Sequence, residues 1–311
     1  MLYFIILGLL LILILGISYY AFRIAFLAPP PLDSNHYISP EGEQYDEVRE
    51  GIRKSVAKMA ARKYESVTIT SFDGCKLFAK YYHTADDAPV QILFHGYKST
   101  SLLDCSGGTY LAADCLKHNV IVVDQRSHGQ SSGKVITFGI KERKDCLCWI
   151  EYAKKRFGND VPIILSGLSM GAATVLMACD LALPSNVKGI IADCPYSSPK
   201  EIIMKAAKEM HFPPHLMLPF VWLGGFLYGH FNLFESSATQ AIKNSEIPIL
   251  ILHGDADELV PFEMSKSMLS SGAKDITLES FSGAGHGLSY IVIPDKYENV
   301  VIKFVKRCLD S

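Results

Sequence analysis

The fold of this chain is decided by the stretch Ile163-Ile164-Leu165-Ser166-Gly167-Leu168-Ser169-Met170-Gly171-Ala172-Ala173. Its apolar start is short enough for a buried strand, and the small and straight-chain residues at its end are typical of a helix. A serine on so tight a strand-to-helix turn adopts strained backbone angles, and only small residues at 167 and 171 let the two chain directions pass. The Gly-x-Ser-x-Gly spacing therefore predicts a nucleophile elbow that holds the Ser169 hydroxyl out of the sheet. An ordinary Gly-rich strand end is the alternative.

Short apolar runs alternate with helical stretches on both sides of this motif. The runs, each suited to a strand buried on both faces, are 90–94, 120–123, 163–165, 189–192, 249–252 and 276–278. The helical stretches are 141–157, 170–183, 263–270 and 295–309. Ahead of them, 67–70 and 76–79 flank the turn pair Asp73-Gly74, which is a hairpin signal. The pattern predicts an α/β domain over residues 66–311, with a mostly parallel sheet flanked by helices.

Composition narrows the class of protein. A chain of 311 residues that is 49% hydrophobic and 20% charged can bury one large core, and we expect one domain with attachments. The net charge of -2 and the lack of a basic block argue against a nucleic-acid partner. Eight cysteines are scattered without metal-type pairs, which favours a reducing compartment over a disulfide framework.

The N-terminus predicts a membrane anchor over residues 1–28. Residues 1–22 carry no charged side chain, and at about 1.5 Å per residue they are long enough to cross a hydrocarbon core of about 30 Å. A secretory signal peptide is the alternative, but a basic start and a small-x-small cleavage site are missing. Arg23, which follows the span, and the reduced cysteines favour a cytoplasmic position for the rest of the chain.

A stalk is expected between the anchor and the domain, over residues 29–65. Pro29-Pro30-Pro31 ends the first helix and begins an extended exit from the membrane. Residues 45–63 then place apolar side chains at helical spacing among charged ones, which predicts an amphipathic helix lying on the domain or on the lipid surface.

The regular alternation fails once, at an insertion of about residues 197–246. This segment is rich in aromatic residues and broken by prolines, with Trp222 and several Phe, Tyr, Leu and Gly residues between 216 and 231. Placed over the C-terminal edge of a parallel sheet, it would form a lid with an apolar underside. Packing onto the core is the alternative. His211 and His215 lie four apart, but the prolines between them disfavour a helical pair of metal ligands.

Five motifs in order carry a family resemblance. They are Phe94-His95-Gly96-Tyr97, the run 124–131 (DQRSHGQS), the elbow at 167–171, the run 253–261 (HGDADELVP) and Gly283-Ala284-Gly285-His286-Gly287. From about Ser66 to the end, the chain resembles the α/β-hydrolase superfamily. Within it, the chain is similar to membrane-anchored bacterial hydrolases that share features with the prolyl-oligopeptidase-like and Bem46-like groups. The resemblance implies hydrolysis of esters or amides by a serine.

The histidine that activates Ser169 is expected to be His286. A serine hydroxyl is a poor nucleophile until a base within hydrogen-bond reach takes its proton. His286 follows the last predicted strand in a Gly-rich loop, and its position matches the base of the family. His95, His128 and His253 are rivals by residue type only, since they follow earlier strands.

The acid that orients this histidine is expected to be Asp257. It matches the family's Asp-x-x-Val-Pro pattern before Pro261 and completes the chain order Ser, Asp, His. Asp255, a turn former after Gly254, is the first alternative, and Asp193, which follows the preceding strand, is the second.

The oxyanion of the reaction needs preorganised donors, and the resemblance assigns them to the backbone amides of Tyr97 and Met170. The Tyr97 hydroxyl is a candidate for one more contact with substrate. Arg126 and His128 are expected to brace the loop rather than to react.

These observations predict a serine hydrolase that works through an acyl-enzyme without a metal or organic cofactor. An apolar lid and a lipid anchor favour a carboxylic ester or thioester with an apolar acyl group as the small-molecule or lipid substrate. A serine peptidase of the prolyl-oligopeptidase-like type is the alternative. A membrane-tethered binding protein without catalysis is a second alternative, because a fold does not determine a function.

Overall fold

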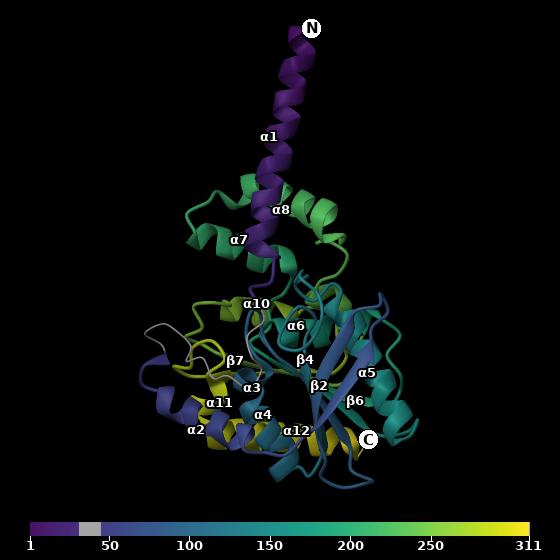
Figure 1. Ribbon diagram of the computed structural model, residues 1–311. Coiled ribbons are helices and arrows are strands. Elements are labelled where there is room, and N and C mark those ends of the chain that lie inside the picture. The colour runs from purple at the N-terminus through teal and green to yellow at the C-terminus, as the bar shows by residue number, and fades with distance from the viewer. Residues whose placement is uncertain (31–44, 311) are drawn as a thin grey trace.

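A twisted eight-stranded sheet forms the centre of the molecule (Figure 1). The structure is a computed structural model that describes residues 1–30 and 45–310. In these residues the strand order is β1-β2-β4-β3-β5-β6-β7-β8. The strands are β1 Glu65–Thr70, β2 Lys76–Tyr82, β3 Val90–Phe94, β4 Asn119–Asp124, β5 Ile163–Leu168, β6 Val187–Asp193, β7 Ile249–Gly254 and β8 Ile276–Phe281. β1 pairs antiparallel with β2, and β2 pairs antiparallel with β4. The six strands β3 to β8 are parallel to one another. The expected mostly parallel sheet is confirmed.

The strands form where the sequence has apolar runs because both faces of the sheet are covered. All five residues of β3 and all six of β4 are buried. Alternate residues of β5 enter two different cores: Ile163 and Leu165 pack in the cluster that holds Trp149, whereas Ile164 packs in the cluster that holds Val305. The β1–β2 hairpin turns at Gly74, whose φ of 85° is a conformation that favours glycine.

Helices cover both faces of the sheet. They are α2 Arg49–Ala60, α3 Ser101–Asp104, α4 Ser106–Tyr110, α5 Glu142–Phe157, α6 Met170–Met177, α7 Pro199–Glu209, α8 Pro214–Gly229, α9 Ala238–Ala241, α10 Phe262–Met268, α11 Ser289–Val292 and α12 Pro294–Leu309, with a π-helical turn at Leu111–Cys115 and a 3-10 turn at Ala178–Asp180. Apolar side chains of α5 and α6 pack with one face, and those of α12 pack with the other.

The first helix, α1 (Leu2–Ala25), projects from the rest of the molecule and is long and apolar enough to cross a membrane (Figure 1). Its last two turns differ from the rest because Ser18, Ala21 and Phe22 are buried. Phe26, just after the helix, has no exposed surface and lies edge-on against the rings of Phe138 and Phe231. The anchor expected over 1–28 therefore ends inside the core of the domain and does not lead directly into a stalk.

The amphipathic helix expected over 45–63 is present as α2. Its buried residues Ile52, Val56 and Met59 face the domain, where they share a core with Leu93 and Val122. Packing on the domain is thus confirmed over packing on lipid. The first part of the expected stalk, including Pro31, lies outside the described residues, and the boundaries at 28 and 65 stay predictions.

The insertion between β6 and β7 contains α7, α8 and α9. α8 lies beside the C-terminal part of α1, away from the sheet (Figure 1). This placement determines which part of the insertion can reach the candidate site.

Candidate active site

Ser169 lies on the sharp turn between β5 and α6. Its φ of 54° and ψ of -114° place it in a strained region that a non-glycine residue rarely adopts. A Cβ added at Gly167 would lie 2.2 Å from the backbone carbon of Gly171, and one added at Gly171 would lie 2.1 Å from the carbonyl oxygen of Phe94. Both positions therefore exclude any side chain, as the motif predicts.

Asp257 and His286 are in direct contact. The Nδ1 atom of His286 lies 2.7 Å from Oδ2 of Asp257, whose side chain is fully buried. Because the carboxylate only accepts, Nδ1 carries the proton and Nε2 is left as the basic nitrogen. The other oxygen, Oδ1, accepts the amides of Leu259 and Val260 at 2.9 and 2.8 Å.

The electrostatics keep Asp257 ionised. Burial on its own would raise the pKa of this carboxyl, but hydrogen bonds from His253 and His286, the charge of His286 and the Val260 amide lower the pKa well below its ordinary value. An ionised acid at this position stabilises the imidazolium form of His286 when it takes up a proton.

The two alternative acids have other hydrogen-bond partners, although Asp193 also lines the cavity of Ser169 and His286. Asp255 accepts the amide of Gly283 at 2.7 Å, which is a loop-bracing contact close to the role of a turn former. Asp193 is buried and accepts the hydroxyl of Tyr297 at 2.9 Å. Of the three aspartates considered, only Asp257 has a described hydrogen bond to His286.

Ser169 and His286 open onto the same cavity, which has a volume of about 270 Å³. Its apolar wall comes from Ile52 of α2, Leu103 of α3 and Ile291 of α11, together with loop residues. None of its described lining residues belongs to the insertion 197–246. The expectation that the insertion forms the apolar roof of this cavity is therefore wrong, because α8 packs on α1 instead.

The loop after β3 lies beside the elbow. A Cβ added at Gly96 would lie 3.4 Å from Cβ of Ser169, so the chain passes Ser169 at van der Waals distance. The Gly96 amide is held by Asp104 at 2.7 Å. The Tyr97 hydroxyl donates to the carbonyl oxygen of Ala25 at 2.8 Å, so it is directed to α1, and the expectation that it touches substrate is wrong.

Comparisons with known proteins agree with this geometry. The profile of the family described as alpha/beta hydrolase fold matches residues 89–237. The uncharacterized protein YqkD of Bacillus subtilis is 26% identical over 234 residues, which cover 75% of this chain and 76% of that protein. The Pyrococcus furiosus esterase Pf2001 has a TM-score of 0.65 at 22% identity, covering 91% of this chain and 98% of that one. The protein has the α/β-hydrolase fold.

Two further proteins are similar to this chain, one in sequence and one in structure. Lysophosphatidylserine lipase ABHD12 of Danio rerio is 25% identical over 212 residues, which cover 65% of this α/β-hydrolase but 51% of the lipase. The chain thus spans about half the length of that relative. The ferulic acid complex of Est1E from Butyrivibrio proteoclasticus has a TM-score of 0.62 at 22% identity, covering 79% of this chain and 100% of that one. The family resemblance drawn from the five motifs is confirmed.

Two of the rival histidines of this α/β-hydrolase act as fixed braces. His95 accepts the amide of Gln125 through Nε2 at 3.0 Å, and burial lowers its pKa to about 4. His128 accepts the amide of Lys98 through Nε2 at 3.0 Å, and burial followed by the charge of His95 lowers its pKa to about 3. Both rings are therefore neutral near pH 7, and both tie the loops that flank the elbow.

The third rival, His253, has a role that the sequence did not reveal. Its Nε2 lies 2.9 Å from the carbonyl oxygen of Val260 and 3.2 Å from Oδ2 of Asp257, while Nδ1 lies 2.6 Å from the hydroxyl of Ser265. Two acceptors beside Nε2 mean that this nitrogen carries the proton. His253 thus donates to the same carboxylate oxygen as His286 and holds it in place.

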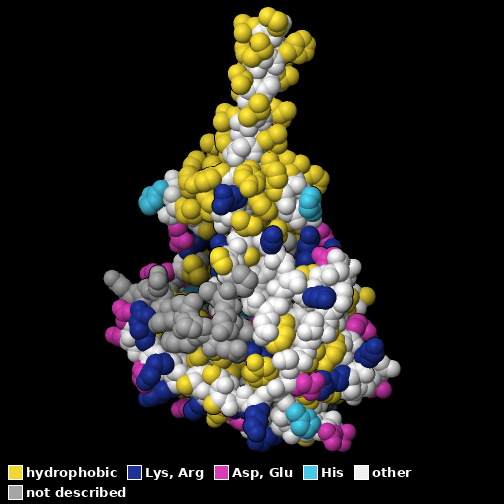
Figure 2. All heavy atoms as spheres, in the orientation of Figure 1, with side chains coloured by type: hydrophobic (Ala, Val, Ile, Leu, Met, Phe, Trp, Pro, Cys, Tyr) yellow, Lys and Arg dark blue, Asp and Glu magenta, His cyan; other side chains and the backbone are white. Residues whose placement is uncertain are grey.

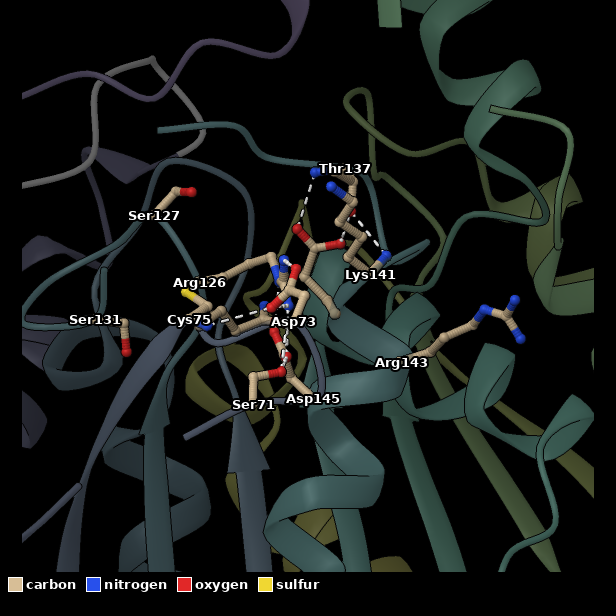
Figure 3. A network of polar contacts seen from close by, with 12 residues as sticks. Ser71, Asp73, Cys75, Arg126, Ser127, Ser131, Thr137, Lys141, Arg143 and Asp145 are labelled. Carbon is tan, nitrogen blue, oxygen red and sulfur yellow. Dashed lines mark hydrogen bonds and ion pairs between the residues drawn. The ribbon is translucent and has the colours of Figure 1, made fainter. Parts of the chain in front are cut away.

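Arg126 forms the centre of a buried polar network that braces the β1–β2 hairpin (Figure 3). Its guanidinium contacts Asp145 through two nitrogens, each at 2.6 Å, and Asp73 at 2.9 Å. The bidentate pair satisfies both charges. The expected bracing role of Arg126 agrees with these contacts, which leave the guanidinium directed at the hairpin.

Cys194, which follows β6, also reaches the site. Its sulfur and the ligating atoms of Asp257 and His286 all lie within 4.8 Å of one another. Asp257 and His286 already share a hydrogen bond of 2.7 Å, so the set fits an acid–base pair better than a metal site. Burial raises the pKa of Cys194 well above its ordinary value, which keeps the thiol neutral. The scattered spacing of the cysteines in the sequence did not predict that Cys194 lies beside Asp257 and His286.

Proposed function

We propose that this α/β-hydrolase cleaves carboxylic esters or thioesters through Ser169, His286 and Asp257. The observation that carries the proposal is that His286, whose Nδ1 contacts the buried Asp257, opens onto the same cavity as the strained Ser169. Nucleophile, base and acid then have the roles that acyl transfer needs.

In the first half of the reaction, the Ser169 hydroxyl attacks the acyl carbon while Nε2 of His286 takes its proton. The amides of Tyr97 and Met170 are the proposed donors to the oxyanion. His286 then gives the proton to the leaving alcohol or thiol, and the acyl group stays on Ser169. In the second half, water attacks the acyl-enzyme through His286 and releases the acid.

Ester cleavage is favoured over peptide cleavage by the walls of the cavity. Ile52, Leu103 and Ile291 offer an apolar surface to an acyl chain, and the volume of about 270 Å³ lies at the small end for ligand sites. The relative that is named a lysophosphatidylserine lipase supports a lipid acyl ester as the substrate class. A serine peptidase is the alternative.

The proposal includes membrane attachment through α1, with the catalytic domain in the cytoplasm. Cleavage of α1 as a signal sequence would remove Phe22, and a cut after residue 28 would also remove Phe26, both of which are buried in the core. Arg23 after the span and eight cysteines without disulfides favour the cytoplasmic side.

A fluorophosphonate probe tests the proposed nucleophile. We expect it to label the protein and to fail on Ser169→Ala, with Ser166→Ala as a matched control that keeps labelling. p-Nitrophenyl esters of increasing acyl length, set against aminoacyl amides, then test the substrate class. Faster cleavage of the amides would favour the peptidase, and no labelling of the folded wild-type protein would favour the non-catalytic binding protein.

A further inference from the structure

Exposed apolar side chains gather at the base of α1 (Figure 2). They belong to α8 and the loop before it: Met210, Phe212, Leu216, Phe226 and Leu227. Leu216 is 64% exposed and Phe226 is 54% exposed, so large apolar side chains are exposed near both ends of α8. α8 has no Asp, Glu, Lys or Arg in its 16 residues. A helix that is apolar on all sides is typical of a buried or lipid-facing position.

α8 is fixed to one level of α1 by close packing. A Cβ added at Gly224 would lie 2.4 Å from the carbonyl oxygen of Ser18, so only glycine permits this approach. The hydroxyl of Tyr228 donates to the carbonyl oxygen of Leu15 at 3.3 Å, and its ring also packs edge-on against Tyr19. α8 therefore lies beside residues 15–22 of α1.

The length of α1 then determines where this contact lies relative to a bilayer. The part of α1 ahead of the contact, residues 2–14, is about 20 Å long at about 1.5 Å per residue. A hydrocarbon core of about 30 Å needs about 20 residues, so a spanning α1 must use residues up to about 21. Tyr19, Tyr20 and Arg23 are residue types that mark the edge of the hydrocarbon. The stretch that contacts α8 is thus inside the membrane or at its boundary.

We propose that α8 is itself a membrane-contacting helix, whose exposed apolar face lies in the bilayer interface beside α1. One side of α8 is buried against protein through Val221, Gly224 and Gly229. The exposed side chains of Leu216 and Phe226 would contact the acyl chains of the lipids. The occupant is lipid rather than a second copy because the patch is continuous with the candidate span. The apolar composition of the insertion is then explained by the membrane and not by an acyl pocket. The inference does not depend on the reaction at Ser169.

The test uses tryptophan fluorescence in the full chain. The two native tryptophans differ: Trp149 is fully buried in the core, whereas Trp222 lies on α8. In a Trp222→Phe background, Leu216→Trp places a probe on the proposed face, and Tyr64→Trp places a matched aromatic probe ahead of β1. Each protein is reconstituted in phosphatidylcholine vesicles with and without bromine on the acyl chains, and membrane association is checked by co-flotation.

We expect brominated lipid to quench the Leu216→Trp probe several-fold more than the Tyr64→Trp probe, and bromine near the headgroup to quench more than bromine near the chain end. Equal quenching of the two probes would overturn the proposal, as would failure of the full chain to float with vesicles. A Leu216→Trp probe shielded from both brominated lipid and aqueous acrylamide would show that a protein partner covers α8, which also overturns it.

Discussion

The Tyr97 hydroxyl donates a hydrogen bond of 2.8 Å to the carbonyl oxygen of Ala25, in the last turn of α1. Lys98 reaches the carbonyl oxygen of Ile24 from the same loop. The last four carbonyls of a helix lack partners within it, so the loop after β3 satisfies two of them. The end of the candidate anchor and the loop that holds the proposed oxyanion donor thus form one structural unit.

This unit predicts that the position of an N-terminal truncation decides its effect. Deleting residues 2–14 leaves every described contact of Phe22, Ala25 and Phe26, so we expect a folded and active enzyme in detergent. Deleting residues 1–27 also removes Phe26, and loss of a core phenylalanine costs about 3–5 kcal/mol. Thermal unfolding and ester hydrolysis of both proteins check this. Equal stability and activity would show that the end of α1 is dispensable.

Tyr97→Phe tests whether the same contact positions the loop. The ring still packs on Phe138, but the hydrogen bond to Ala25 is lost, at a cost of about 1 kcal/mol in unfolding free energy. We expect kcat to fall several-fold with little change in KM. Tyr228→Phe is the matched control, since it removes a bond to Leu15 far from the loop. If both variants leave kcat unchanged, the contact is structural only.

Asp257→Asn is expected to lower kcat by about 10⁴-fold, because the neutral amide can no longer stabilise the imidazolium of His286. Asp255→Asn is the matched control and should have a small effect, since Asp255 holds only the Gly283 amide. Steady-state kinetics on one ester measure both. A larger loss in Asp255→Asn would reject the proposed acid.

Asp193 predicts a pH dependence of stability. Burial raises its pKa to about 6, and its Oδ1 has no described hydrogen-bond partner. The unfolded chain loses this proton near pH 4 and the folded chain near pH 6. The free energy of unfolding therefore falls as the pH rises between these two values, and above pH 6 this loss stays constant. Asp193→Asn removes the penalty and keeps an oxygen that can accept the Tyr297 hydroxyl.

Chemical or thermal unfolding at pH 4.5 and 7.5 measures this effect. We expect Asp193→Asn to be more stable than wild type at pH 7.5, by up to about 3 kcal/mol, and to differ much less at pH 4.5. The same stability difference at both pH values would contradict the raised pKa.

The cavity walls predict where acyl length is selected. Each methylene that enters an apolar cavity adds up to about 0.8 kcal/mol, so efficiency should rise with acyl length until the cavity is full. Leu103→Trp narrows the wall and should shorten the preferred chain while sparing acetyl esters. Trp222→Ala, on the insertion, should leave the profile unchanged. A chain-length profile that changes in Trp222→Ala but not in Leu103→Trp would place the acyl site at the insertion.

Local patterns were enough to predict the strands, the elbow and the superfamily. Buried strands need apolar runs, and the crossing at the elbow tolerates no side chain at 167 or 171, so these requirements appear directly in neighbouring residues. The order of Ser169, Asp257 and His286 along the chain follows from the same motifs. The proposed site could therefore be predicted at the level of residues.

Only the tertiary structure could decide which surface each residue meets. Asp255 and Asp257 share one loop, and the packing of the distant loop that carries His286 brings one of them into contact. In the same way, composition predicted an apolar insertion but not its neighbour, which is α1 rather than the cavity. Tyr97 was expected at substrate, yet its hydroxyl meets Ala25, 72 residues earlier in the chain. Contacts between segments so far apart depend on how the whole chain packs, so the spacing of neighbouring residues cannot predict them.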